Sequence, residues 1–159
     1  MIGYDGVSMT AAADLLLFDR SDELVALVDT DSVHGRTAQW AAEFRRGRLR
    51  RARMLVPFHL LITSDRLFLW KEAPPVPATI PPTLTVRTEP LLEGYFAQLG
   101  VSPESVRQKT FQDIVYMWLV DLMWLRPGTP IPPELAWAAD CGFLASINDG
   151  LVRSANLAV

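Results

Sequence analysis

Two short aliphatic runs near the start of the chain dominate the pattern of its first half. Residues 14–19 are apolar between Asp14 and Asp19, residues 24–31 are apolar up to the acidic end that begins at Asp29, and the polar residues 20–23 separate the two runs. Short apolar runs bounded by turn residues predict two buried strands of a hairpin. A turn centred on Ser21 and Asp22 places Asp14 directly opposite Asp29 on the partner strand.

The pattern that follows predicts a helix and two further strands. The helix begins near Arg36 and carries Trp40 and Phe44 on one face. Gly47 lowers the helix propensity, so the arginine-rich segment around and after it is expected to be a frayed last turn or a loop. Residues 58–63 and 67–71 are apolar runs of strand length. Because a helix connects the second and third strands, these two strands can pair in parallel. We therefore expect an α/β fold with a mixed sheet.

The second half of the chain is predicted to be mainly helical. Residues 72–90 hold half of the twelve prolines, so we expect an extended connection that is neither helix nor central strand. An apolar stripe over residues 91–99 ends at Gly100, and Ser102 with Pro103 predicts the start of a long helix whose apolar face runs over residues 111–125. A last helix over residues 132–147 and a strand over residues 151–159 follow. The expected organisation is a single domain, residues 1–159.

Composition narrows the class of protein. The chain has 159 residues, of which 50% are hydrophobic and 21% charged, which excludes a disordered protein. No apolar stretch approaches the roughly 20 residues that span a bilayer, and the N-terminus lacks a signal pattern, so we expect a cytoplasmic protein without a membrane partner. Cys141 is the single cysteine, which excludes an internal disulfide and a cysteine metal cluster.

Three carboxylates converge at the end of the predicted hairpin. Asp31 lies two residues beyond Asp29 and so points to the same face as Asp29, near Asp14. Such carboxylates repel one another unless a positive charge lies between them. A divalent metal is one candidate, and ordinary capping of turns by aspartate is the alternative. His34 is either a fourth ligand or a solvated loop residue, whereas His59 is expected to be a hydrogen-bonded core residue.

An arginine cluster follows the predicted helix although the net charge of the chain is −3. It can contact phosphates or an acidic protein, and its members point in nearly all directions if the segment is helical. The cluster consists of Arg45, Arg46, Arg48, Arg50, Arg51 and Arg53. Trp137 and the proline-rich segment are candidates for a surface that binds a protein partner.

The order of these segments resembles the core of the PD-(D/E)XK, or restriction-endonuclease-like, nuclease superfamily. The resemblance rests on Asp14 at the start of a strand, the Asp29-x-Asp31 strand, the helix segment 40–46 and the hairpin 60–70. It implies a restriction-endonuclease-like mixed sheet and hydrolysis of DNA or RNA phosphodiester bonds with Mg²⁺ or Mn²⁺. In this resemblance Asp14 matches the first metal-binding acid and Asp29 the second, and Asp31 is a further candidate ligand.

The chain departs from that family at one position. The family has a lysine two residues after the second acid, where this chain has Asp31, and Arg36 is a candidate substitute. The missing lysine favours a non-catalytic, nuclease-like subunit that binds a protein or nucleic acid within a larger complex. The alternative is an active Mg²⁺-dependent nuclease, in which the arginine cluster steers the phosphate backbone. We expect no small-molecule cofactor, and the resemblance associates such proteins with bacterial defence.

Overall fold

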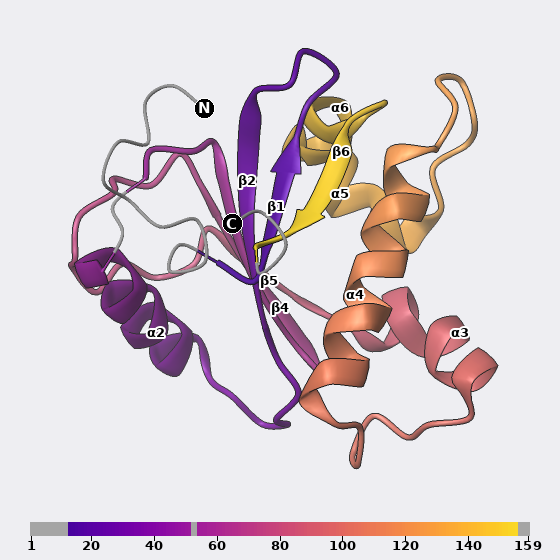
Figure 1. The fold of residues 1–159 in the computed structure, drawn as a ribbon, viewed down its shortest axis with the longest axis horizontal. Helices are drawn as coiled ribbons and strands as arrows, with labels where there is room; N and C mark the ends of the chain where they lie inside the picture. Colours follow the sequence, from indigo (N-terminus) through magenta and orange to yellow (C-terminus); the bar gives the residue numbers. More distant parts are fainter. Residues whose placement is uncertain (1–12, 52–53, 156–159) are drawn as a thin grey trace.

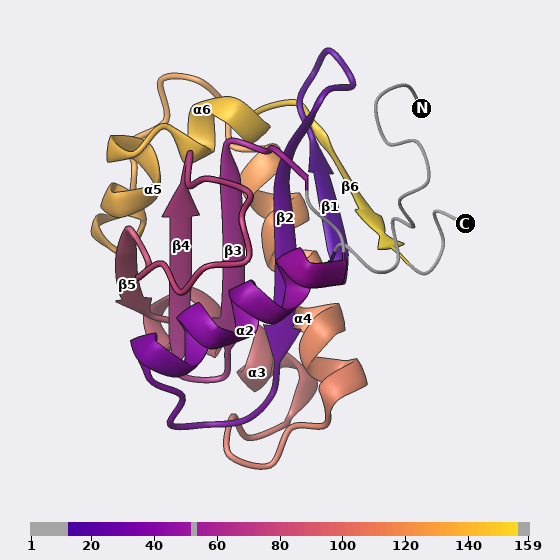
Figure 2. The ribbon, with the colours of Figure 1, turned by 90° about the vertical axis from the view of Figure 1, so that its left-hand side faces the viewer.

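A mixed β-sheet forms the centre of the protein, and helices cover both of its faces. The computed structural model describes residues 13–51 and 54–155. Helix α2 covers one face of the sheet, and the helices of the C-terminal half cover the other (Figures 1 and 2). The chain is therefore an α/β protein, as the sequence predicts. Among the described residues, none of the helices combines the length and the apolar character that a membrane span requires.

The sheet has six strands in the order β5-β4-β3-β2-β1-β6. Strands β2 and β3 are parallel, joined by the crossover through α2, and the other neighbouring pairs are antiparallel. The proline-rich segment contributes β5 only at the edge of the sheet, where missing backbone N–H donors cost least. The strands are β1 (Leu15–Phe18), β2 (Leu24–Asp31), β3 (Phe58–Thr63), β4 (Arg66–Lys71), β5 (Leu84–Arg87) and β6 (Leu151–Ser154).

The register of the predicted hairpin is confirmed. Leu15 pairs with Val28 and Leu17 with Ala26, and the Asp14 N–H donates to the carbonyl of Val28 at 3.1 Å. The register shifts by one residue at Phe18, next to the turn. Asp14 therefore lies at the end of the ladder opposite the Asp29 end of β2, as expected.

The helices are α2 (Ala38–Arg51), α3 (Glu89–Leu99), α4 (Gln108–Met123), the 3-10 helix η1 (Pro133–Leu135), α5 (Ala136–Asp140) and α6 (Phe143–Ile147). They follow the predicted pattern with three corrections. Gly47 does not end α2, since packing on the sheet overrides its low helix propensity. Helix α4 begins at Gln108 and not after Ser102. The predicted last helix breaks at Gly142, whose φ of 88° is left-handed.

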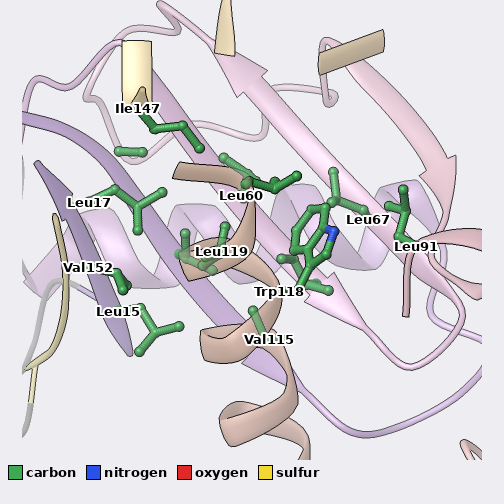
Figure 3. Close-up of a cluster of buried hydrophobic side chains, with 14 of the residues drawn as sticks. Leu15, Leu17, Leu60, Leu67, Leu91, Val115, Trp118, Leu119, Ile147 and Val152 are labelled. Carbon is green, nitrogen blue, oxygen red and sulfur yellow. The ribbon is translucent and has the colours of Figure 1, made fainter. Parts of the chain in front are cut away.

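The two faces of the sheet pack against unequal cores. The larger core lies between the sheet and α3, α4 and α6, where Leu60 and Leu67 meet Trp118 and Leu119 (Figure 3). On the opposite face Ala41 of α2 contacts a smaller cluster that includes Trp70. The α2 face also holds buried polar side chains, and these form the candidate site.

Candidate functional site

Asp14 and Asp29 come together beneath α2, and an arginine lies between them. Asp29 is fully buried in the middle of the sheet, and the side chain of Asp14 is 28% exposed. Arg48 Nη2 lies 2.5 Å from Asp29 Oδ1 and 3.4 Å from Asp14 Oδ1. The guanidinium thus supplies the positive charge that two converging carboxylates require. We call Asp14, Asp29, Arg48 and His59 the Asp29 cluster.

His59 occupies the other oxygen of Asp29. Its Nε2 lies 2.8 Å from Asp29 Oδ2, and the imidazole is 5% exposed. The ring also lies 5.5 Å from the ring of Trp70, measured between centroids. A buried carboxylate is costly unless hydrogen-bonded partners compensate its charge. Arg48 and His59 together meet this requirement for Asp29, one on each oxygen.

Asp14 is hydrogen-bonded to Thr30, near the C-terminal end of β2. Its Oδ2 accepts hydrogen bonds from the Thr30 N–H at 2.8 Å and the Thr30 hydroxyl at 3.1 Å. Burial raises the pKa of the Asp14 carboxyl and the nearby Asp29 charge adds to this, while the Thr30 hydrogen bonds and Arg48 oppose it. Gln108 Nε2 donates to Thr30 Oγ1 at 2.9 Å, which connects the cluster to the start of α4.

Asp31 has separate partners. Its Oδ2 lies 3.4 Å from Arg36 Nη2, and its Oδ1 accepts from the Val33 N–H at 3.1 Å. The Arg36 guanidinium also lies 4.1 Å from the centre of the Trp40 ring. The prediction that three carboxylates converge is therefore wrong for Asp31, which does not join Asp14 and Asp29. Arg36 pairs with Asp31, so it is not placed on the Asp14–Asp29 pair where a catalytic cation would act.

A divalent metal does not fit the Asp29 cluster. Metal ligands must offer free oxygens at about 2.0–2.6 Å from the ion. Both oxygens of Asp29 already contact nitrogen atoms, and a guanidinium lies between the two carboxylates. Within residues 13–51 and 54–155, no group of three or more His, Cys, Asp and Glu side chains is arranged to hold a metal ion.

The arginine cluster of the sequence divides into inward-facing and outward-facing members. Arg45 is 4% exposed and donates from Nη2 to the carbonyl of Pro74 at 3.0 Å, and burial lowers the pKa of its guanidinium. Arg48 points inward to Asp29. Arg46 pairs with Glu43 at 3.6 Å on the surface. Arg50 and Arg51 are exposed, and Arg53 lies outside the described residues. The predicted basic patch therefore lacks Arg45 and Arg48.

The part that Arg48 and His59 play was missed at the sequence level. The sequence pattern places Arg48 in a cluster that contacts phosphates or an acidic protein, and it predicts a hydrogen-bonded core position for His59 without identifying the partner. One signal was present: a buried acid at Asp29 requires a cation, and Arg45 and Arg48 are three residues apart on a helix that packs on the same sheet. His34, the candidate fourth ligand, instead lies against Ser64.

The aromatic side chains of the helical half differ from expectation in exposure. Trp137 is half-buried and stacks on Phe143 with 6.3 Å between ring centroids, so it is a weaker candidate for a partner surface. Trp124, at the end of α4, is 74% exposed. A hollow of about 290 Å³ lies beside that end of α4, and we call it the Arg126 hollow.

Comparisons of the chain with models of known protein families, with curated proteins and with solved structures found no match in any of the three.

Proposed function

We propose that this chain is a non-catalytic, nuclease-like protein that serves as a binding subunit of a larger complex, in a restriction-endonuclease-like fold. The observation that supports this is the position of Arg48. In an active site of the PD-(D/E)XK type, a metal ion lies between the two acids. Here the guanidinium lies 2.5 Å from Asp29 and 3.4 Å from Asp14 in that position. The cluster then stabilises the fold and performs no chemistry. The cytoplasmic location stays a prediction.

A cleavage assay tests the non-catalytic part of this proposal. Labelled single-stranded DNA, duplex DNA and RNA are incubated with the protein and Mg²⁺ or Mn²⁺, beside Asp29→Asn and the surface control Asp113→Asn. We expect no metal-dependent cleavage from any of the three proteins. Cleavage by the wild type and by Asp113→Asn, lost in Asp29→Asn, would overturn the proposal and establish an active nuclease.

The Arg126 hollow supports a protein as the binding partner. It is lined by apolar residues from α4 and α6, and among its described lining residues the only charges are Arg20 and Arg126. Ile131, which lines the hollow, is 44% exposed, and Trp124, which lies in sequence between the lining residues Leu122 and Leu125, is 74% exposed. Exposed apolar side chains next to charges of a single sign, here positive, are typical of interaction sites. We therefore propose that the partner presents an acidic segment with apolar side chains.

Peptide binding tests this surface directly. The probes are two labelled peptides with the same leucines, one flanked by glutamates and one by lysines, and the readout is fluorescence anisotropy. We expect the acidic peptide alone to bind, more weakly as salt rises, because exposed charges are screened. Arg126→Glu should abolish binding, and Arg107→Glu, which changes the same charge on another exposed site, should not. Equal binding of both peptides, or binding that survives Arg126→Glu, would contradict an acidic partner in this hollow.

A further inference from the structure

A second site lies at the carboxyl ends of β2 and β3, on the side of α3. It is a pocket of about 410 Å³, and we call it the His34 pocket. The loop after β2 supplies His34, the turn after β3 supplies Ser64 and Asp65, and α3 closes the side with Phe96. The loop between β2 and α2 and the loop between α3 and α4 lie at the same end of the protein in both views (Figures 1 and 2). In α/β proteins this end of parallel strands is where ligands bind.

A serine and a histidine meet in this pocket. Ser64 Oγ lies 2.5 Å from His34 Nδ1. Ser64 is 4% exposed and directly follows β3, so the sheet fixes its position, while His34 is on the exposed side of the pair. When Nδ1 is unprotonated, the hydroxyl donates its proton to this nitrogen. A hydroxyl held against a base in this way is the arrangement that activates serine as a nucleophile.

The surrounding residues hold the histidine in place. The Gly35 N–H donates to the carboxylate of Asp65 at 3.2 and 3.3 Å, and the Thr63 hydroxyl donates to the same carboxylate at 3.1 Å. Gly35 has a φ of 80°, a conformation that other residues rarely adopt. Asp65 therefore fixes the loop that carries His34 against the turn that carries Ser64.

A second carboxylate, that of Glu104 in the α3–α4 loop, lines the same pocket as His34. Hydrogen bonds from the Ser102 hydroxyl and from its own backbone N–H lower the pKa of Glu104, and attraction to His34 lowers it further. A negative charge near an imidazole stabilises the imidazolium that forms when it accepts a proton. The pocket thus holds a hydroxyl, a base and an acid on three different segments of the chain.

We propose that Ser64 is a nucleophile and His34 its general base, in a site that hydrolyses carboxylic esters. Ser64 Oγ bonds to the ester carbonyl carbon while its proton passes to His34 Nδ1. The bond to the leaving alkoxide then breaks, and that alkoxide takes the proton from His34. A water molecule attacks the acyl-serine next, with His34 accepting and then returning its proton, which releases the carboxylic acid and restores Ser64.

The lining of the pocket indicates the class of ester. Phe96, Val101 and Pro103 offer apolar contacts to an acyl group. The acids in the lining outnumber the two arginines, which disfavours anionic substrates. The site therefore suits an uncharged or cationic ester with an apolar acyl chain. This activity goes beyond the proposed binding function, in which the nuclease-like Asp29 cluster is what is non-catalytic, and it uses none of the residues of that cluster.

Covalent labelling tests the nucleophile without knowledge of the natural substrate. A fluorophosphonate probe reacts when serine displaces fluoride from phosphorus, and intact mass with peptide mapping locates the adduct. We expect labelling at Ser64 and slow turnover of p-nitrophenyl butyrate. Both should be lost in Ser64→Ala and unchanged in Ser105→Ala, which alters an exposed serine. His34→Gln should slow labelling about 10²–10⁴-fold, the usual contribution of a general base.

A second variant covers the case in which Ser64→Ala fails to fold. Ser64→Cys keeps a nucleophile at the same position, and its alkylation by iodoacetamide should be faster with His34 than with His34→Gln in the same background. The folded state of each variant is checked by circular dichroism and urea unfolding. A folded wild type that is not labelled at Ser64, or labelling that is equally fast without His34, would overturn the proposal.

Discussion

Replacing Arg48 with methionine is the most direct test of how the Asp29 cluster stabilises the fold. The variant keeps an apolar stem on α2 but removes the guanidinium, so Asp29 is left buried with His59 as its hydrogen-bonding partner on one oxygen. Asp29 is 0% exposed and the Arg48 side chain 15%. Breaking a buried ion pair from one side costs about 3–5 kcal/mol, because it leaves a buried charge uncompensated. We expect a loss of unfolding free energy in this range.

The same helix provides a matched control. Arg46 pairs with Glu43 at 3.6 Å, and the two side chains are 39% and 51% exposed. Such surface pairs contribute about 0–1 kcal/mol. Arg46→Met removes the same chemical group from α2, so the difference between the two variants reports burial and not the loss of an arginine as such.

Urea unfolding at neutral pH measures both variants. Tryptophan fluorescence and circular dichroism should give the same midpoint, which supports a two-state analysis. At about 2–4 °C per kcal/mol for a chain of this size, the melting temperature of Arg48→Met should fall by about 6–20 °C. Adding Asp29→Asn to Arg48→Met should cost less than the sum of the single changes, because the removed charges compensate each other. The reasoning is refuted if Arg48→Met lies within about 1 kcal/mol of Arg46→Met.

Two further predictions concern stability. Because burial raises the pKa of Asp14 above 3.8, its protonated form is favoured in the fold. The stability of the wild type relative to Asp14→Asn should therefore decline as the pH rises above about 4, measured by urea unfolding from pH 4 to 7; a rising difference would contradict this. Gly150→Ala should destabilise by about 1–3 kcal/mol or more, since its Cβ would lie 2.1 Å from the Phe18 carbonyl oxygen. Gly94→Ala in α3, with nothing within 4 Å, should instead stabilise by about 1 kcal/mol, and equal shifts in melting temperature would refute the comparison.

Local sequence pattern was sufficient for strands β1 to β4 because they are strongly apolar and sharply bounded, whereas β5 lies in the proline-rich segment and was not predicted as a strand. The turn at Ser21 and Asp22 fixed the register from Leu15 to Leu17, and the helical crossover made the parallel pairing of β2 with β3 foreseeable. The prediction of one continuous last helix was wrong because the end of a helix there is not marked by the apolar pattern. Its apolar spacing continues through Gly142, but a left-handed residue breaks the backbone there, and periodicity does not detect that break.

The two candidate sites show a different limit on what can be predicted from the sequence. The sequence placed Asp14 opposite Asp29, because strand pairing depends on local turn geometry. It did not reveal that Arg48 lies between them, since that requires knowing which side of α2 faces the sheet. The same holds for the pair of Ser64 and His34, which are 30 residues apart in the chain and meet at 2.5 Å.

The sequence by itself determined strands β1 to β4, the α/β class and the face that Asp14 and Asp29 share, because these follow from periodicity and short-range turns. Tertiary structure alone decided the partners of each charge. Arg45 and Arg48 became interior side chains and Arg46, Arg50 and Arg51 surface ones through the rotation of a single helix against the sheet. A buried charge takes whichever partner the packing brings within a few ångströms, and that proximity is a property of the fold and not of the spacing along the chain.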